Sequence, residues 1–262
     1  MNTRISAIKN DVQDRNSLAW KKLCDFVAKV ALEGRDEFSP LEELGPELFS
    51  QIYTLPESIS TLKKVKKVWL YGSKLKRIPP EIGEMESLEY FDPYTSYDLH
   101  WFPYEIIDCK NLKDSRVSTR ALYGNYKNRM GFPRLIHNPV RYEGSTAKCS
   151  ICKKEMSWRE TNQLWVSLWV GTDVLPLLAN VCSQKCESVI PAPPKHYIPH
   201  PHKGGVELKQ SPGGDEFLRQ QINELKQNSP EKIIDIASIM ENNENPGKQF
   251  PLIKLIRKIW KK

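Results

Sequence analysis

Four of the six cysteines form two close pairs with the spacing of metal ligands. Cys149 and Cys152 are separated by two residues, so one tight turn can direct both sulfurs to the same point. Cys182 and Cys186 are separated by three residues, and residues four apart share one face of a helix. Four thiolates satisfy the tetrahedral coordination of a structural zinc ion. The spacing therefore predicts a zinc site that joins two segments distant from each other in the sequence.

Other roles for these cysteines are open at this stage. A catalytic zinc ion usually has three protein ligands and one position for water, and four thiolates leave no such position. A redox role suits the first pair but leaves the second pair unexplained, and an iron–sulfur site or unliganded thiols are further alternatives. The isolated Cys24 and Cys109 lie at apolar positions of their segments, which predicts small buried side chains without a function.

The segment between the two pairs is expected to position them. Residues 164–170 mix β-branched and aromatic side chains, which predicts a strand. The order of a cysteine turn, strands and a cysteine pair at a helix N-terminus resembles a treble-clef zinc finger. Residues 181–186 are similar to the closing half of small zinc modules that end in cysteine-serine-x-x-cysteine, with one additional residue here. The resemblance implies a zinc module.

A second pattern precedes the cysteines. The motif that begins at Leu55-Pro56 recurs at Ile78-Pro79 and again at Phe102-Pro103, at two nearly equal intervals. Each unit also has apolar residues at its fifth, eighth and eleventh positions. These are Ile59, Leu62 and Val65, then Ile82, Met85 and Leu88, then Ile106, Cys109 and Leu112. A period in the twenties with fixed apolar positions predicts a solenoid.

These units resemble leucine-rich repeats of the bacterial and plant-like type, in which Leu-Pro-x-x-Ile precedes a short strand motif. Residues 65–70 fit the strand motif, whereas residues 88–93 and 112–117 fit it loosely. Ser73, Ser96 and Arg120 occupy the place of the usual asparagine. The resemblance covers roughly residues 44–136, with a fourth, atypical unit ending at Phe132-Pro133. Residues 118–125 and 201–205 are also similar to bacterial leucine-rich-repeat proteins of unassigned role.

The predicted fold is α/β: a short leucine-rich-repeat solenoid with an N-terminal helical cap, a small zinc-binding module and a helical C-terminal tail. The predicted boundaries are 1–43 for the cap, 44–136 for the repeats, 137–205 for the zinc module with a Pro/His-rich connector, and 206–262 for the basic tail. Apolar spacing predicts a helix over residues 16–33, capped by Asn16 or Ser17 and ended by Gly34, and a shorter helix over 41–53. A short array leaves two open ends, so the helix should cover the first and the segment after residue 136 the last.

The outward positions of the repeat strands are the candidate partner-binding residues, because side chains alternate along a strand. They are Lys67, Trp69, Tyr71, Tyr90, Asp92, Tyr94, Asp114 and Arg116. Tyrosine, tryptophan and arginine carry much of the energy of protein interfaces. The alternative is that these aromatic rings pack beneath a neighbouring part of the same chain.

Two segments leave their roles open. His196, His200 and His202 lie among five prolines, which favours an extended connector over a surface patch or a second metal site, and the nearby glycine pairs are interpreted as linker. Residues 248–262 predict a basic amphipathic helix that packs on its own protein, binds a partner's groove or lies on an anionic membrane.

The composition, and the absence of several catalytic motifs, narrow the range of functions to be expected. The chain has 39 Lys and Arg against 32 Asp and Glu, a net charge of +7 that suits an acidic partner. It has no signal-like run at its N-terminus and no apolar stretch long enough to span a membrane, so a cytoplasmic protein is expected. No nucleophile elbow, metalloprotease helix or phosphate loop occurs. The leading hypothesis is a non-enzymatic protein-binding adaptor in a bacterial cell.

Two alternatives accompany this hypothesis. One is nucleic-acid binding through basic residues, with aromatic side chains for stacking. The residues concerned are Lys63, Lys64, Lys66, Lys67, Arg120, Lys127, Arg129, Lys153 and Lys154, with Trp69 and Tyr71. The other is peripheral membrane association through the basic tail.

Overall fold

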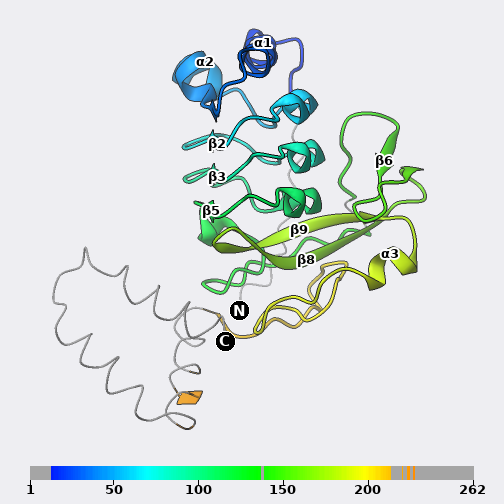
Figure 1. Cartoon of the computed structure of the whole chain (residues 1–262). Coiled ribbons are helices and arrows are strands. Elements are labelled where there is room, and N and C mark those ends of the chain that lie inside the picture. The colour runs from blue at the N-terminus through cyan, green and yellow to red at the C-terminus, as the bar shows by residue number, and fades with distance from the viewer. Residues whose placement is uncertain (1–12, 137–138, 214–219, 221–222, 225–226, 228–262) are drawn as a thin grey trace, which may run out of the picture. The chain divides into compact units, whose positions relative to one another are not determined.

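Figure 1 shows the computed structural model of the chain, which describes residues 13–136, 139–213, 220, 223, 224 and 227. The chain divides into two compact units, residues 1–213 and 214–262, and the account below concerns the first. The predicted basic helix of residues 248–262 lies outside the described residues. Across the described part of the chain, no helix has the length and apolar character to cross a membrane.

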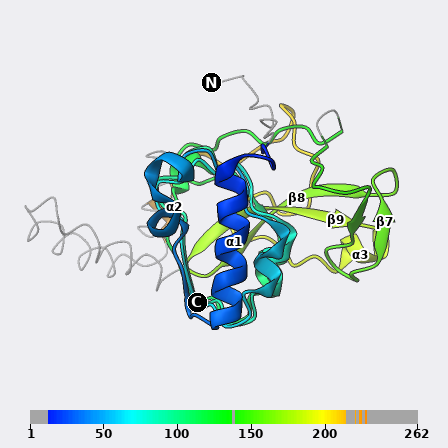
Figure 2. The same ribbon diagram turned by 90° about the horizontal axis from the view of Figure 1, so that it is seen from above.

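The first helix, α1 (Leu18–Glu33), confirms the predicted helix over residues 16–33. The hydroxyl of Ser17 caps it by accepting the N–H of Trp20 at 3.2 Å, and Gly34 ends it in the left-handed conformation. The second helix, α2 (Pro40–Phe49), matches the shorter helix that was predicted next. Figure 2 shows α1 lying across the end of the stacked strands and turns that follow, where its apolar face is buried.

The repeated segments form a parallel sheet in the order β1 (Glu37–Phe38), β2 (Lys67–Trp69), β3 (Tyr90–Asp92) and β5 (Asp114–Ser115). Lys67 pairs with Tyr90, and Tyr90 pairs with Asp114, so the sequence period is the register of the sheet. Each unit returns through a 3-10 helix: η1 (Glu57–Thr61), η2 (Pro80–Glu84) and η3 (Tyr104–Asp108). A side chain at Gly83 would strike the carbonyl oxygen of Glu105, so glycine there lets η2 and η3 approach closely.

The apolar positions that recur in the sequence form the core between the sheet and the 3-10 helices. Leu55, Ile78 and Phe102, the isoleucines four residues later, and Leu62, Met85 and Cys109 are all at most 4% exposed. Ser73 and Ser96 are buried at the place of the usual asparagine, and their hydroxyls hydrogen-bond to each other at 2.6 Å. Arg120 takes no part in this ladder and lies in η4 (Thr119–Ala121).

Strand β1 was not predicted, because two residues are too short to show an alternating pattern. Phe38 of β1 is buried and stacks on Phe26 of α1 with ring centroids 5.2 Å apart. The strand therefore attaches the helical segment to the sheet edge that α1 and α2 cover.

A long hairpin closes the last open end, as expected for the segment after residue 136. Its strands are β8 (Asn162–Val170), which contains the predicted strand over 164–170, and β9 (Asp173–Val181). β9 pairs in parallel with β4 (Phe102–Pro103) of the third unit, and the hydroxyl of Ser115 donates to the carbonyl of Val170 at 3.2 Å. One cluster of buried residues runs through the repeated units and this hairpin.

The expected fourth unit at Phe132-Pro133 is wrong. Within the described residues the parallel sheet ends at β5, and Phe132 instead enters a second cluster around Trp101, Tyr123 and Trp165. Its ring lies 5.9 Å from those of both Tyr123 and Trp165 and 4.6 Å from that of His202. Aromatic packing in this cluster replaces strand pairing, and it brings residues 118–125 and 201–205 together.

The histidine- and proline-rich segment is extended, but interpreting its glycines as linker was wrong. His202 and Trp165 exchange two backbone hydrogen bonds of 2.8 and 2.9 Å. Gly204 has a φ of 72°, and a side chain there would collide with the carbonyl oxygen of Pro133. His202 is buried, with its Nδ1 accepting the N–H of Gly204 at 3.1 Å, whereas His200 is exposed. The segment is therefore part of the packed unit.

Candidate metal centre and binding face

The first cysteine pair lies in the turn between β6 (Thr146–Lys148) and β7 (Glu155–Ser157). The N–H of Lys153 donates to the carbonyl of Cys149 at 2.9 Å, and the N–H of Cys149 donates to the carbonyl of Lys154 at 2.8 Å. Ser150 connects this turn to β9 through a 2.7 Å bond from its N–H to the carbonyl of Asn180. The turn therefore holds both sulfurs beside the end of the hairpin.

The second pair lies where β9 gives way to α3 (Gln184–Ser188), as the spacing predicted. Cys182 follows the strand directly, and Cys186 lies on the helix one turn later. The hydroxyl of Ser183 caps the helix by accepting the N–H of Cys186 at 3.3 Å. This cap fixes the direction of α3 and keeps the two sulfurs on the same side.

The structure brings all four predicted cysteines together, with their sulfur atoms within 4.8 Å of one another. Cys182 Sγ lies 3.6 Å from the sulfurs of both Cys152 and Cys186. A zinc–sulfur bond of about 2.3 Å places the sulfurs of a tetrahedral site about 3.8 Å apart, while a disulfide needs about 2.05 Å. Among the described residues this is the one group that could hold a metal ion, and the histidines of residues 196–202 form no second one.

The electrostatics of the cluster also fit a cation. Burial raises the pKa of Cys149, but backbone N–H groups of Cys152, Ile151 and Cys182 lower it more, to about 6. Hydrogen bonds with the sulfurs of Cys152 and Cys186 raise the pKa of Cys182 to about 12. Neighbouring sulfurs thus cannot all ionise on their own, because like charges repel. A metal cation among them removes that obstacle.

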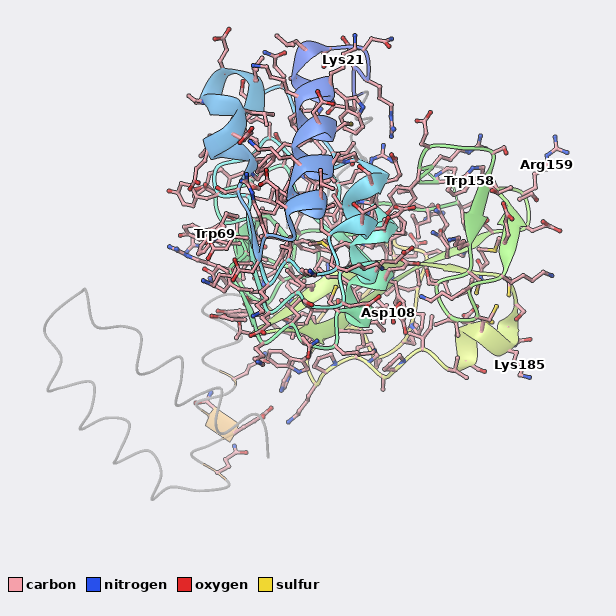
Figure 3. All side chains as sticks on the ribbon, turned by 45° about the horizontal axis from the view of Figure 1, so that its top comes forward. Lys21, Trp69, Asp108, Trp158, Arg159 and Lys185 are labelled. Atoms are coloured by element: carbon pink, nitrogen blue, oxygen red, sulfur yellow. The ribbon has the colours of Figure 1, made fainter. Side chains whose placement is uncertain are left out.

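The predicted partner-binding residues gather on the outer face of the parallel sheet. We call this the sheet face: Lys67, Trp69, Tyr71, Tyr90, Asp92, Tyr94, Asp114 and Arg116. Trp69 packs on Tyr90 with ring centroids 4.9 Å apart, and Tyr71 lies 6.1 Å from Tyr94. Arg116 lies over the ring of Tyr94 at 4.7 Å. Trp69 lies on the opposite side of the unit from Trp158 (Figure 3).

The members of the sheet face differ in their accessibility. Tyr71 is 51% and Tyr94 38% exposed, and Arg116 and Lys67 are exposed as well. Asp92 is only 2% exposed, because it accepts the hydroxyl of Tyr90 at 3.1 Å and the N–H of Tyr94 at 3.0 Å. Asp92 therefore orients its neighbours and is not itself accessible to a partner.

Several of the basic residues considered for nucleic-acid binding make contacts within the protein. Lys63 pairs with Glu84 and Glu86, Lys67 with Glu37, and Lys153 with Asp108. The guanidinium of Arg129 is half-buried and donates to the carbonyls of Gly124, His196 and Ser211. The charged groups of these four side chains are therefore already engaged by groups of the protein itself.

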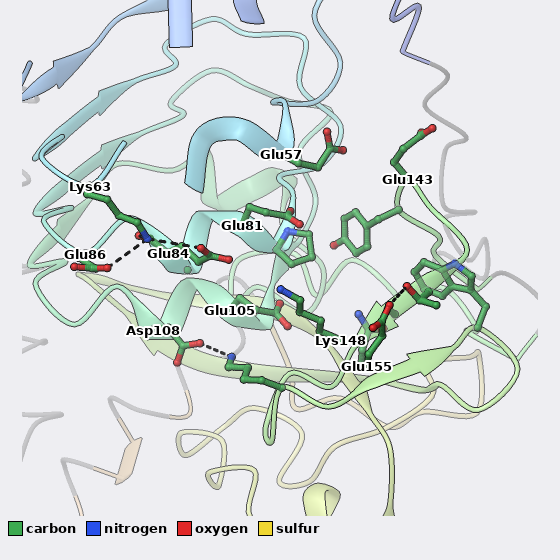
Figure 4. A pocket seen from close by; sticks show the side chains of 18 residues that line it. Glu57, Lys63, Glu81, Glu84, Glu86, Glu105, Asp108, Glu143, Lys148 and Glu155 are labelled. Atoms are coloured by element: carbon green, nitrogen blue, oxygen red, sulfur yellow. Dashed lines mark hydrogen bonds and ion pairs between the residues drawn. The ribbon is translucent and has the colours of Figure 1, made fainter. Parts of the chain in front are cut away.

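Sequence reasoning missed an acidic cleft on the side of the 3-10 helices, where Glu81 and Glu105 point into the same space (Figure 4). A signal was present: these glutamates occupy equivalent places in successive repeats, each just before the isoleucine of its unit. The repeat alone does not reveal that residues of the β6–β7 hairpin line the same space.

The sequence matches no protein-family model and has no significant match among curated proteins.

Proposed function

We propose that this chain is a non-enzymatic adaptor that binds a protein partner on the sheet face. The repeated units would be a short, degenerate leucine-rich-repeat solenoid, capped by α1 at one end and by the β8–β9 hairpin at the other. The strand register, which follows the sequence period, and the buried repeat positions support this interpretation. The four cysteines would hold a structural zinc ion that fixes the hairpin against the array.

The observation that carries the proposal is the pair of aromatic rows on the sheet face. Trp69 with Tyr90, and Tyr71 with Tyr94, present large side chains whose rings contact each other at a tilt. Such rings contribute contact area at a low cost in conformational entropy. Arg116 extends the Tyr71–Tyr94 row; its side chain is 57% exposed, and its guanidinium lies 3.8 Å from the carboxylate of Asp92. The face thus suits a protein segment that offers apolar side chains.

The same observations favour a protein over a nucleic acid as the partner. A nucleic acid needs cations along its backbone, but Lys67 on this face is neutralised by Glu37 at 2.7 Å, and Asp114 adds a negative charge. Membrane association would depend on residues 248–262, which lie outside the described residues.

The test begins with a photo-crosslinking amino acid placed at Tyr71 in cells of the native host. The matched control places it at Leu32 of α1, which is 90% exposed but far along the chain from the sheet face. Crosslinks to one protein from position 71 and none to that protein from position 32 are expected. Nuclease treatment should leave the product unchanged.

The captured protein is then purified and titrated against variants. Trp69→Ala and Tyr71→Ala should each weaken its binding by about 1–3 kcal/mol, with little change in the melting temperature. Leu32→Ala should bind like the wild type. Unchanged affinity in both aromatic variants would show that the sheet face is not the working surface.

A further inference from the structure

A cleft of about 610 Å³ lies between the 3-10 helices η1–η3 and the β6–β7 hairpin, away from the sheet face (Figure 4). Its lining contains eight carboxyl groups and three lysines, although the chain as a whole carries a net charge of +7. Successive repeated units supply Glu57, Glu81 and Glu105 to it. The acidic character is therefore concentrated at one place by the stacking of the units.

Most of the charges around this cleft are already paired. Lys63 contacts Glu84 and Glu86, Lys153 contacts Asp108 at 2.6 Å, and Arg15 contacts Glu57 at 2.7 Å. Three carboxyl groups of the lining stand apart from these pairs; one of them, Glu155, accepts the hydroxyl of Thr146 at 2.6 Å, and the other two are Glu81 and Glu105. Neither Glu81 nor Glu105 forms an ion pair with another described residue.

Three buried oxygen atoms in the cleft lack a hydrogen-bond partner among the described residues: Glu81 Oε2, Glu105 Oε2 and the hydroxyl of Tyr142. Glu105 is only 8% exposed, so water reaches it poorly. All three residues line the same cleft. Burial raises the pKa of Glu105 to about 7, against a smaller opposing effect of a hydrogen bond with Ser150, and also raises that of Glu81. Unpaired buried polar atoms are costly, and each calls for an explanation, of which a bound ligand is one.

We propose that this cleft binds a primary ammonium group on an aliphatic chain, as found in polyamines and in the lysine side chains of other proteins. An ammonium has three N–H donors for the unpaired oxygens of the cleft lining, and its charge offsets the carboxylates. A metal ion fits less well, because among the described residues no three carboxyl or histidine groups of this cleft converge on one point.

Lys148 provides an internal check on this proposal. It extends from β6 toward Glu81, and its charge acts on that carboxyl group (Figure 4). It is exposed and forms no hydrogen bond or ion pair with Glu81 or Glu105 within the described structure. Lys148 therefore competes weakly with a ligand ammonium, and its removal strengthens binding.

The experiment is isothermal titration of the zinc-loaded full chain with spermidine, with Nα-acetyl-lysine amide and with magnesium chloride. Saturable binding of either amine is expected. Glu105→Gln and Glu81→Gln should each weaken it about 10-fold, because a charged hydrogen bond is lost while the side-chain volume is kept. Glu47→Gln on α2 makes the same change of charge outside the cleft and should alter the affinity less than 2-fold.

Lys148→Met should tighten amine binding about 3-fold or more, whereas Lys154→Met, which lies outside the cleft lining, should not. A gain of affinity cannot result from a misfolded variant. Binding of spermidine alone identifies a free polyamine, and binding of the lysine derivative identifies a protein side chain. No saturable amine binding, equal losses in Glu105→Gln and Glu47→Gln, or displacement of the amine by one magnesium ion would overturn the proposal.

Discussion

Replacing Cys152 by serine separates the metal's contribution to stability from that of the side chain. Cys152 is exposed, and its sulfur contacts other cysteines of the cluster, so the substitution removes little packing. Without metal, Cys152→Ser should cost no more than about 0.5 kcal/mol, as surface substitutions usually do. With metal, it removes one of four ligands. Any large effect should therefore depend on zinc.

The magnitude follows from binding linkage. Free zinc at about 1,000 times its dissociation constant stabilises the native state by about 4 kcal/mol. In a unit of this size, about 1 kcal/mol corresponds to about 2–4 °C, so the wild type should melt about 8–16 °C higher with zinc than with a chelator. Neither α3, with five residues, nor the three-residue strands β6 and β7 are long enough to be stable alone.

The assay combines metal analysis with melting curves in zinc and in chelator. The wild type should retain about one zinc ion per chain and Cys152→Ser much less, while Cys24→Ala, a cysteine outside the cluster, should match the wild type. The melting difference between wild type and Cys152→Ser should vanish in chelator. Equal melting temperatures in zinc, or a wild type purified without chelator that holds no zinc, would refute the reasoning.

Three further predictions concern the packed unit. Gly204→Ala should destabilise the unit by about 2–4 kcal/mol, because the cost of a left-handed backbone adds to that of a collision with Pro133. Denaturant unfolding curves would measure this loss. A loss under about 0.5 kcal/mol would contradict the close approach of Gly204 to Pro133. Burial lowers the pKa of His202 to about 3, below its unfolded value of about 6.5. Between these values the unfolded state binds a proton that the folded state does not. The contribution of His202 to the free energy of unfolding is therefore fully present above about pH 6.5 and falls by up to about 1.4 kcal/mol per pH unit below it. Melts from pH 7 to pH 4 should show this slope in the wild type and a smaller one in His202→Asn, and identical slopes would exclude the assignment. The double variant Cys24→Ala, Cys109→Ala should lose about 1–3 kcal/mol of stability, because Cys109 donates a hydrogen bond to the carbonyl of Ile82. Partner binding should stay intact, because burial raises the pKa of both thiols and keeps them unreactive. Lost binding in a folded variant would reopen a functional role.

The sequence alone determined those features that repeat or that depend on short spacing. The repeat period predicted which side chains are buried, because Leu55 and Ile78 occupy equivalent places in stacked units. The spacing of Cys182 and Cys186 predicted a turn of helix, and Ser17 and Gly34 predicted the ends of α1. Each of these depends on neighbours within a few residues or on a repeated local pattern.

The tertiary structure alone decided which distant segments meet. Two residues of β1 pair with β2 because Phe38 packs on Phe26, which no local pattern reveals. Gly204 lies against Pro133 because the second aromatic cluster brings those segments together. Glu81 and Glu105 became an acidic cleft only when the β6–β7 hairpin was placed opposite them. Burial of a polar group depends on what covers it, and the covering segment here comes from a distant part of the chain.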